Sequence, residues 1–214
     1  VADVYQAALA THCGLQVPND QIRDAIQSAL RQRSDEESLR TDEAAEYQFW
    51  CDLIEQLCGS HPGRQACFDD LYDRFQQPDS WRCFDDVATS LQDLRSAGIV
   101  TAIASNFDQR LHPVLDGLTS LAAVPHRFVS SEIGWRKPAQ PFFDHVCEQL
   151  QTDSGRVLFV GDDLTNDVFG ARRAGCRTAW IQRNPDDRQI TPDGTHRLAA
   201  LTEIPDLLMI ETDS

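Results

Sequence analysis

The stretch from Val157 to Ala171 constrains the fold of this 214-residue chain more than any other. Its first four residues are all apolar, and such a continuous run predicts a strand that is buried on both faces. Asp162 and Asp163 follow the run directly, and Asp167 falls on the opening turn of the helix predicted next. Open parallel sheets bind ligands at the carboxyl ends of their strands, and carboxylate oxygens suit Mg²⁺. The stretch therefore predicts either a magnesium site or, as the simpler alternative, a helix cap.

Ser105 and Asn106 stand at the end of a second predicted buried strand, residues 99–104. A hydroxyl group and an amide can both donate hydrogen bonds to phosphate oxygens, and the opening of the following helix adds backbone N–H groups. These two residues are therefore candidates for an anion site, although the same residue types are also typical of a helix N-cap.

Lys137 is the only lysine among the 19 Lys and Arg residues of the chain. Because the chain uses arginine at its other Lys or Arg positions, the single lysine indicates that position 137 requires a compact ammonium rather than a planar guanidinium. The alternative interpretation is an ordinary surface cation. Lys137 precedes Pro138 and a predicted helix, and this position favours the functional interpretation.

The pattern along the chain divides it into a helical part and an alternating part. Residues 1–78 carry apolar residues at helical spacing in four segments, with Asn19 or Asp20 as the expected cap of the second. Helices and strands then alternate, which predicts a parallel sheet covered by helices on both faces. The expected strands are 99–104, 127–131, 157–160 and 178–181, and the expected helices are 86–97, 108–115 and 139–150. Residues 184–196 read as a polar connection, and residues 198–209 as a terminal helix broken at Pro205.

Charge and composition exclude several classes of protein. The net charge of −15 argues against nucleic acid or an anionic membrane surface as a partner. No apolar run is long enough to span a bilayer and the chain shows no signal-peptide pattern, so a cytoplasmic location is expected. The seven cysteines show no Cys-x-x-Cys spacing and are expected to be reduced thiols.

Three short motifs now stand in one order: Ser105 after a strand, Lys137 before a proline, and Gly161 to Asp167 as Gly-Asp-x-x-x-x-Asp. Together they resemble motifs two, three and four of the haloacid dehalogenase superfamily, in the branch with a helical cap. The resemblance implies a helical cap domain at residues 1–78. It implies a doubly wound, parallel, Rossmann-like α/β core at residues 79–214.

The same resemblance implies roles for the candidate residues. Ser105 and Asn106 would hold the transferred phosphoryl group, and Lys137 would neutralise its charge. Asp162 would bind Mg²⁺ directly. Asp163 and Asp167 would either bind the ion directly or contact one of its direct ligands. The reaction implied is Mg²⁺-dependent hydrolysis of a small phosphorylated metabolite through an aspartyl-phosphate. The pattern specifies neither the metabolite nor the oligomeric state.

The chain departs from the superfamily pattern in one respect. The superfamily begins with a strand ending in Asp-x-Asp, whose first Asp is the nucleophile, but this chain contains no Asp-x-Asp. Asp3 lies in a helical pattern and is no substitute. We therefore expect the first core strand and the nucleophile to be missing from residues 1–214 and to be encoded upstream of Val1. The chain alone is then expected to be inactive and poorly stable.

Two further functions remain open from the sequence. The first is a non-catalytic relative that binds a phosphorylated ligand or a protein partner. The second is haloacid dehalogenation, which needs no metal and is therefore disfavoured by the cluster of acids that ends at Asp167.

Overall fold

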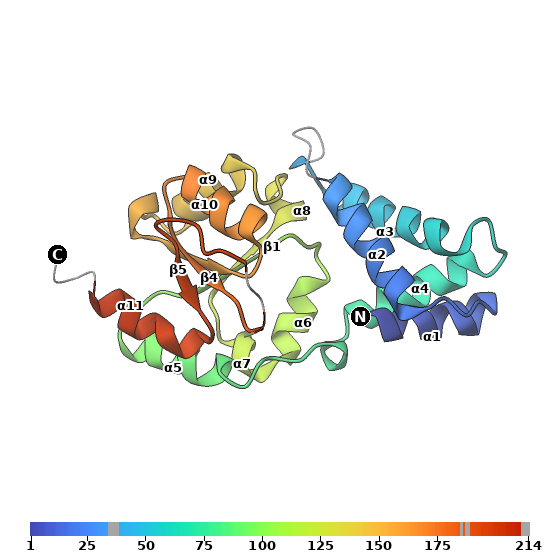
Figure 1. Cartoon of the computed structure of the whole chain (residues 1–214), viewed down its shortest axis with the longest axis horizontal. Coiled ribbons are helices and arrows are strands. Elements are labelled where there is room, and N and C mark those ends of the chain that lie inside the picture. Colours follow the sequence, from blue (N-terminus) through green and yellow to red (C-terminus); the bar gives the residue numbers. More distant parts are fainter. Residues whose placement is uncertain (34–38, 185, 187–188, 211–214) are drawn as a thin grey trace.

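Four helices form a lobe of their own at the start of the chain (Figure 1). The computed structural model describes residues 1–33, 39–184, 186 and 189–210. The lobe consists of α1 (Ala2–Cys13), α2 (Asn19–Gln32), α3 (Glu43–Cys58) and α4 (Arg64–Phe75). The apolar faces of these helices pack into one hydrophobic core, whose buried members include Tyr5, Leu9, Ile22, Leu53, Ile54, Phe68 and Leu71. The four helices predicted from spacing are thus confirmed, while the expected cap of α2 is wrong, because Pro18 precedes that helix without a side-chain cap.

The rest of the chain alternates between short parallel strands and helices. The strands are β1 (Ala102–Ser105), β2 (His126–Val129), β3 (Leu158–Gly161), β4 (Arg177–Ile181) and β5 (His196–Leu198). The α-helices are α5 (Val87–Ser96), α6 (Leu111–Gly117), α7 (Thr119–Ala122), α8 (Ser130–Ile133), α9 (Gln140–Gln149), α10 (Gly170–Arg173) and α11 (Ile204–Ile210). Helical segments of other types are the 3₁₀ turns η2 (Pro78–Ser80), η3 (Ser154–Arg156) and η5 (Leu201–Glu203) and the π-helix η4 (Leu164–Phe169).

Helices cover both faces of this sheet region (Figure 1). On one face α9 and α10 pack against β3, with Phe143, Phe159 and Ala171 buried between them. On the other face α5 and α11 pack against β4 and β5, and this second cluster includes Leu94 and Ala179. The predicted α/β architecture with parallel strands and helices on both sides is therefore confirmed.

The strands form two separate groups. β1 pairs with β2, and β3 pairs with β4, which pairs with β5; every pairing is parallel. In the part of the chain that the structure describes, no strand pairs with the free edge of β1 or with the free edge of β3. The carboxyl ends of β1 and β3, which carry the candidate residues, thus flank a break in the sheet.

Several predicted boundaries are corrected by the structure. Ile99 and Val100 lie outside β1 and are 42% and 67% exposed, because the Ile99 N–H donates to the Leu94 carbonyl and completes the end of α5. Burial on both faces is also wrong for β1 and β3, since Phe159 is the single buried residue of these two strands. Pro205 stands in the first turn of α11 and does not break the helix. In the first turn a backbone N–H has no acceptor within the helix, so a proline, which lacks this N–H, costs no hydrogen bond.

The end of the chain also differs from its prediction. His196–Leu198 forms β5 rather than a connection followed by a helix. Ser130 opens α8 instead of continuing β2. Part of the polar connection predicted at 184–196, together with residues 211–214, lies outside the described residues.

The helical lobe contacts the α/β part through a short antiparallel bridge. The Thr41 N–H donates to the Gly134 carbonyl at 3.2 Å, and the Arg136 N–H donates to the Leu39 carbonyl at 2.8 Å. Next to this bridge, the Glu43 carboxylate accepts a hydrogen bond from the Gln109 N–H. The domain boundary at residue 78 stays a prediction. Among the described helices, none combines the length and the apolar character needed to cross a bilayer.

Candidate active site

Lys137 joins the ends of the two strand groups. Its ammonium Nζ donates to the Ala104 carbonyl of β1 at 3.1 Å and to Asp167 Oδ1 in η4, just after β3, at 2.6 Å. The Lys137 and Asp167 side chains are only 10% and 8% exposed, and Nζ lies 5.5 Å from the centre of the Phe159 ring. This burial excludes the alternative that Lys137 is an ordinary surface cation.

Asn106 holds the backbone of Lys137. The Asn106 Nδ2 donates to the Lys137 carbonyl at 2.9 Å, and the Lys137 N–H donates to Asn106 Oδ1 at 2.7 Å. Lys137 precedes Pro138 through a cis peptide bond. Both the Nδ2 and the Oδ1 of Asn106 are thus hydrogen-bonded to Lys137, which lies about thirty residues further along the chain. These two bonds position the backbone of Lys137. A phosphate contact from Asn106 stays a prediction.

Ser105 closes β1 directly after the carbonyl that binds Lys137. The residue is half-buried, and its hydroxyl has no hydrogen-bond partner among the described residues. A serine hydroxyl carries one donor and two acceptor positions, so this side chain can bind a ligand without first breaking a bond within the protein.

Asp163 serves as a helix cap. Its Oδ1 accepts hydrogen bonds from the N–H groups of Thr165 and Asn166 at 2.8 and 2.9 Å, and its Oδ2 accepts one from Asn166 Nδ2 at 2.9 Å. These bonds satisfy backbone donors at the start of η4, as a capping side chain does. The alternative interpretation of the acidic pair as a cap therefore describes this residue.

Asp162 and Asp167 have opposite environments. Asp167 is buried, and its Oδ2 accepts the Asp163 N–H at 3.1 Å while its Oδ1 binds Lys137. Asp162 is exposed, and its carboxylate has no partner in the described part of the chain. The Asp162 backbone is nevertheless fixed, because its carbonyl accepts a 3.0 Å hydrogen bond from the Trp180 indole of β4.

The three predicted metal-binding residues therefore do not form one cluster of free carboxylates. Within the described ranges, no group of three or more His, Cys, Asp or Glu side chains is arranged to hold a metal ion. Mg²⁺ usually binds through one or two carboxylates and keeps several waters. The residues present fit such a site in part: Asp162 offers a free carboxylate, whereas Asp163 and Asp167 are already bound to donors of the protein.

Two residues have roles in the site that the sequence did not predict, although Gly161 was already part of the Gly-Asp-x-x-x-x-Asp motif. A Cβ atom at Gly161 would lie 2.1 Å from Asp167 Oδ2, so the carboxylate occupies the space that a larger residue would need. The position of Gly161 between a strand and an acidic pair was the available signal. Ala104 contributes through its carbonyl, which leaves no signal in the identity of a side chain.

A second buried ionic cluster adjoins the site through Arg136. Arg33 donates to Glu46 through two bonds of 2.8 and 2.9 Å, Thr41 donates to the same carboxylate, and Arg136 Nη1 lies 3.7 Å from it. Burial raises the pKa of Glu46, but the bonds from Arg33 and the charge of Arg136 outweigh it and lower that pKa. Burial and the neighbouring charge of Arg33 lower the pKa of Arg136 to about 10. The cluster ties α2 and α3 to the residue beside Lys137.

Comparison with known proteins identifies the family of the chain. A family model described as haloacid dehalogenase-like hydrolase matches residues 6–175. The Danio rerio haloacid dehalogenase-like hydrolase domain-containing protein 3 is 27% identical over 214 residues, which cover 95% of this chain and 88% of that protein. The pyrimidine 5'-nucleotidase YjjG of Escherichia coli is 34% identical over 84 residues, which cover 37% of this chain and 36% of that protein.

Solved structures show the same fold. The HAD-hydrolase YfnB of Bacillus subtilis, bound to magnesium, superposes with a TM-score of 0.73 at 22% identity, covering 97% of this chain and 90% of that one. The family model spans most of the chain, including Ser105, Lys137 and Asp162 to Asp167. The chain therefore belongs to the haloacid dehalogenase-like hydrolase family.

Proposed function

We propose that this chain is the phosphate-binding part of a phosphohydrolase that acts on a small phosphorylated metabolite. The observation that carries the proposal is the Lys137 ammonium, held between the end of β1 and Asp167 beside the free hydroxyl of Ser105. An ammonium has three donors, and two of them are used within the described residues, so one remains for a ligand. Transfer of a phosphoryl group depends mainly on positioning and on charge stabilisation, which these two side chains can supply.

Mg²⁺ is the cofactor that this function needs. Asp162 would hold the ion, which would neutralise phosphate charge when bound. The magnesium in the Bacillus subtilis relative and the nucleotidase activity in the name of the Escherichia coli relative support a metal-assisted phosphatase.

The nucleophile is the part that residues 1–214 do not supply. The chain has no Asp-x-Asp, and the sheet is broken between β1 and β3, where the Lys137 ammonium contacts the Ala104 carbonyl of β1 and Asp167 just after β3. We assign the nucleophilic aspartate to a further strand that pairs with both free edges. Its carboxylate oxygen would attack phosphorus as the ester bond to the alcohol breaks, and the second Asp of an Asp-x-Asp on that strand would give the leaving alcohol its proton. Water would then attack the phosphorus of the aspartyl-phosphate, which releases phosphate and restores the carboxylate.

The lack of an Asp-x-Asp also supports a second candidate, a relative that binds a phosphorylated ligand without hydrolysing it. Both candidates require phosphate to bind at Ser105 and Lys137. They differ in whether the phosphate ester is hydrolysed once a further strand pairs with β1 and β3. A cytoplasmic location and the absence of a nucleic-acid partner follow from the sequence and stay predictions.

The single lysine allows a direct test of phosphate binding. Protein labelled with ¹³Cε-lysine should give one lysine side-chain signal, and titration with inorganic phosphate should shift it. Ser105→Ala should weaken phosphate binding about tenfold, because it removes one hydrogen bond to a charged ligand worth roughly 1.5 kcal/mol. Ser96→Ala, an exposed serine at the end of α5, is the matched control and should leave the affinity unchanged.

Lys137→Arg tests whether the site needs an ammonium. The planar guanidinium keeps the charge but does not fit between the Ala104 carbonyl and Asp167, so calorimetry should show strongly weakened phosphate binding. Absence of any lysine shift at tens of millimolar phosphate would refute the proposed site. Hydrolysis of p-nitrophenyl phosphate by residues 1–214 alone would refute the assignment of the nucleophile to a further strand.

A further inference from the structure

Ser130 carries a buried hydroxyl that neither the sequence motifs nor the proposed function uses. The residue opens α8 directly after β2 and is 0% exposed. Its Oγ accepts a hydrogen bond from the Phe107 N–H at 3.1 Å and donates one to the Phe107 carbonyl at 3.0 Å. A hydroxyl has one proton to donate and two acceptor positions, so both bonds can form at the same time. One buried side chain thus fixes both polar groups of a single backbone residue.

These two bonds begin where the pairing of β1 with β2 ends. The last register pair of the two strands is Ser105 with Val129. Backbone groups that follow the last pair of a ladder need other partners. The Phe107 carbonyl also accepts a hydrogen bond from the Ser131 N–H at 3.2 Å, whereas the Phe107 N–H bonds to the Ser130 hydroxyl. The Ser130 side chain therefore extends the contact between the two strands into the loop that follows β1.

The neighbouring residue of this loop is tied to Lys137. Asn106 bonds through its Nδ2 and Oδ1 to the carbonyl and the N–H of Lys137. Loop residues 105–107 are thus bound to a single stretch of chain, residues 130–137. Ser105, whose hydroxyl is free to bind a ligand, directly precedes the two tied residues. The place of this hydroxyl relative to the Lys137 ammonium consequently depends on both ties.

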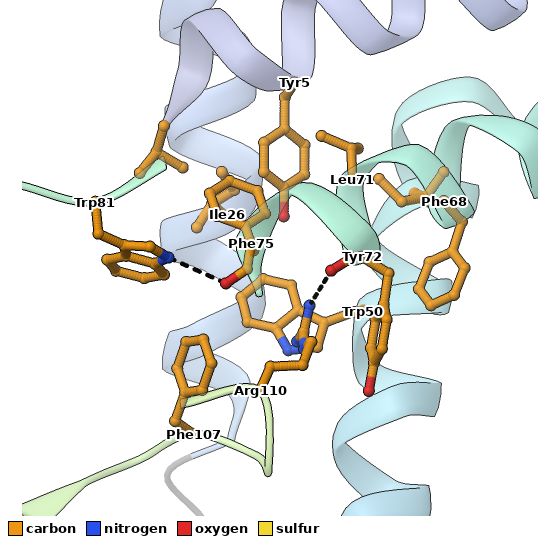
Figure 2. Close-up of a pocket in the computed structure, with 12 residues that line it drawn as sticks. Tyr5, Ile26, Trp50, Phe68, Leu71, Tyr72, Phe75, Trp81, Phe107 and Arg110 are labelled. Carbon is orange, nitrogen blue, oxygen red and sulfur yellow. Dashed lines mark hydrogen bonds between the residues drawn. The ribbon is translucent and has the colours of Figure 1, made fainter. Parts of the chain in front are cut away.

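The side chain of Phe107 is held separately from its backbone. Figure 2 shows its ring beside Trp81, and the two rings meet edge-on at 5.7 Å between centroids. A contact between apolar rings fixes where Phe107 lies, but the orientation of its peptide groups requires directional bonds. The Ser130 hydroxyl supplies these bonds, and the orientation that they set determines the path of the chain back to Ser105.

We propose that Ser130 is a positioning residue of the phosphate site. Through the Phe107 backbone it holds the loop in the arrangement in which the Ser105 hydroxyl and the Lys137 ammonium bind one phosphate. The inference rests on the proposed function for the phosphate and on the two Oγ bonds for the mechanism. A loop that is ordered before the ligand arrives loses less freedom on binding, which strengthens the affinity.

Ser130→Ala tests this inference with two readouts. Hydrogen exchange of the Phe107 amide reports the tie in the ligand-free protein and should become at least about tenfold faster, because the amide loses its acceptor. The amides of β4, which is paired on both sides, should keep their protection, so the loss is local. Titration of the ¹³Cε signal of Lys137 with inorganic phosphate should show an affinity that is roughly three- to tenfold weaker.

Ser90→Ala is the matched control for a buried hydroxyl. Ser90 is 1% exposed, and its Oγ donates to the Asp86 carbonyl at 2.7 Å within α5, so this variant should leave both readouts unchanged. Ser130→Cys keeps a side chain of similar size but offers only a weak donor and acceptor, so its phosphate affinity should lie between wild type and Ser130→Ala. If Ser130→Ala fails to fold, Ser130→Cys decides the inference by the same two readouts.

A double variant shows whether Ser130 acts through Ser105. Substitutions that act through one group are not additive, so in the Ser105→Ala background Ser130→Ala should weaken phosphate binding by less than about twofold. A loss in that background as large as in the wild type refutes positioning through Ser105.

The outcomes separate this inference from the proposed function. If phosphate leaves the Lys137 signal of the wild type in place, both are refuted. If the wild type binds phosphate and Ser130→Ala binds it equally well, the proposed function stands and the positioning role is refuted, even where exchange of the Phe107 amide has become faster.

Discussion

Gly161 shows how a residue without a side chain controls the site. A Cβ atom there would lie 2.1 Å from Asp167 Oδ2, and the Asp167 carboxylate cannot give way without leaving Lys137. Gly161→Ala should therefore lower the free energy of unfolding by about 1 to 3 kcal/mol, as overpacking usually does. Urea denaturation measures the loss, and the ¹³Cε signal of Lys137 should move at the same time.

Gly155→Ala is the matched control for this prediction. A Cβ at Gly155 meets no heavy atom within 4 Å, so the substitution should change stability by less than about 1 kcal/mol. Similar losses in both variants would mean that the cost at Gly161 arises from backbone freedom and not from the carboxylate.

At the scale of single residues, the sequence could place the candidates but not their contacts. Ser105 and Asp162 were found because each follows a predicted strand, and strand ends meet at one edge of a parallel sheet. The partners of Asn106 and Asp163 are mostly backbone groups, which carry no signature in a sequence. Their predicted ligand roles consequently stay predictions, while the structure shows a positioning contact and a helix cap.

At the scale of elements, apolar runs predicted the strands but not their lengths. Ile99 and Val100 belong to an apolar run that is equally compatible with a buried strand and with an exposed helix end. Only the pairing of β1 with β2 decides where that strand begins. β5 was missed for the opposite reason, since His196–Leu198 becomes a strand by pairing with β4 and is not apolar enough to be recognised by itself.

Asp86 links three elements and yields a pH-dependent prediction. Its Oδ2 accepts a 3.0 Å hydrogen bond from Nη1 of Arg183, a residue just after β4. The same oxygen accepts a 2.7 Å hydrogen bond from the N–H of Leu201, at the start of η5. Burial raises the pKa of Asp86, but these two bonds and the charge of Arg183 outweigh it and lower that pKa below its ordinary value of 3.8. Asp86→Asn should cost roughly 1 to 3 kcal/mol of unfolding free energy at pH 7.

The sign of the pH effect follows from the lowered pKa. The stabilisation by Asp86 is complete above its ordinary pKa and is lost as the pH falls through the lowered, folded-state value. Urea melts at several pH values should therefore show the difference from Asp86→Asn shrinking below about pH 4. Asp85→Asn, the exposed neighbour, is the control and should change little. A difference that stays constant down to pH 2 would contradict the ionic origin.

At the scale of the whole molecule, the change of pattern near residue 78 predicted two parts but not how they meet. Their junction uses backbone bonds between residues 39–41 and 134–136, and these segments lie almost a hundred positions apart. The separation of β1 from β3 was likewise implied only by a missing motif, and the structure shows it as two free strand edges. A break between free edges is a weak point, since unpaired strand edges invite pairing with other chains.

Glu46 tests whether the two parts act as one unit. Its buried carboxylate on α3 balances Arg33, directly after α2, and Arg136, directly before Lys137. Glu46→Gln would leave two buried guanidinium groups facing each other without their anion, and loss of one partner from such a cluster typically costs about 3 to 5 kcal/mol. Thermal and urea melts should show this loss, and both the Lys137 signal and its response to phosphate should change, because Arg136 is its neighbour in the chain.

Glu55→Gln on the same helix removes an exposed bond to Arg64 and should cost no more than about 1 kcal/mol. If Glu46→Gln melts the helical lobe while the Lys137 signal and its phosphate response stay intact, the lobe does not position the site.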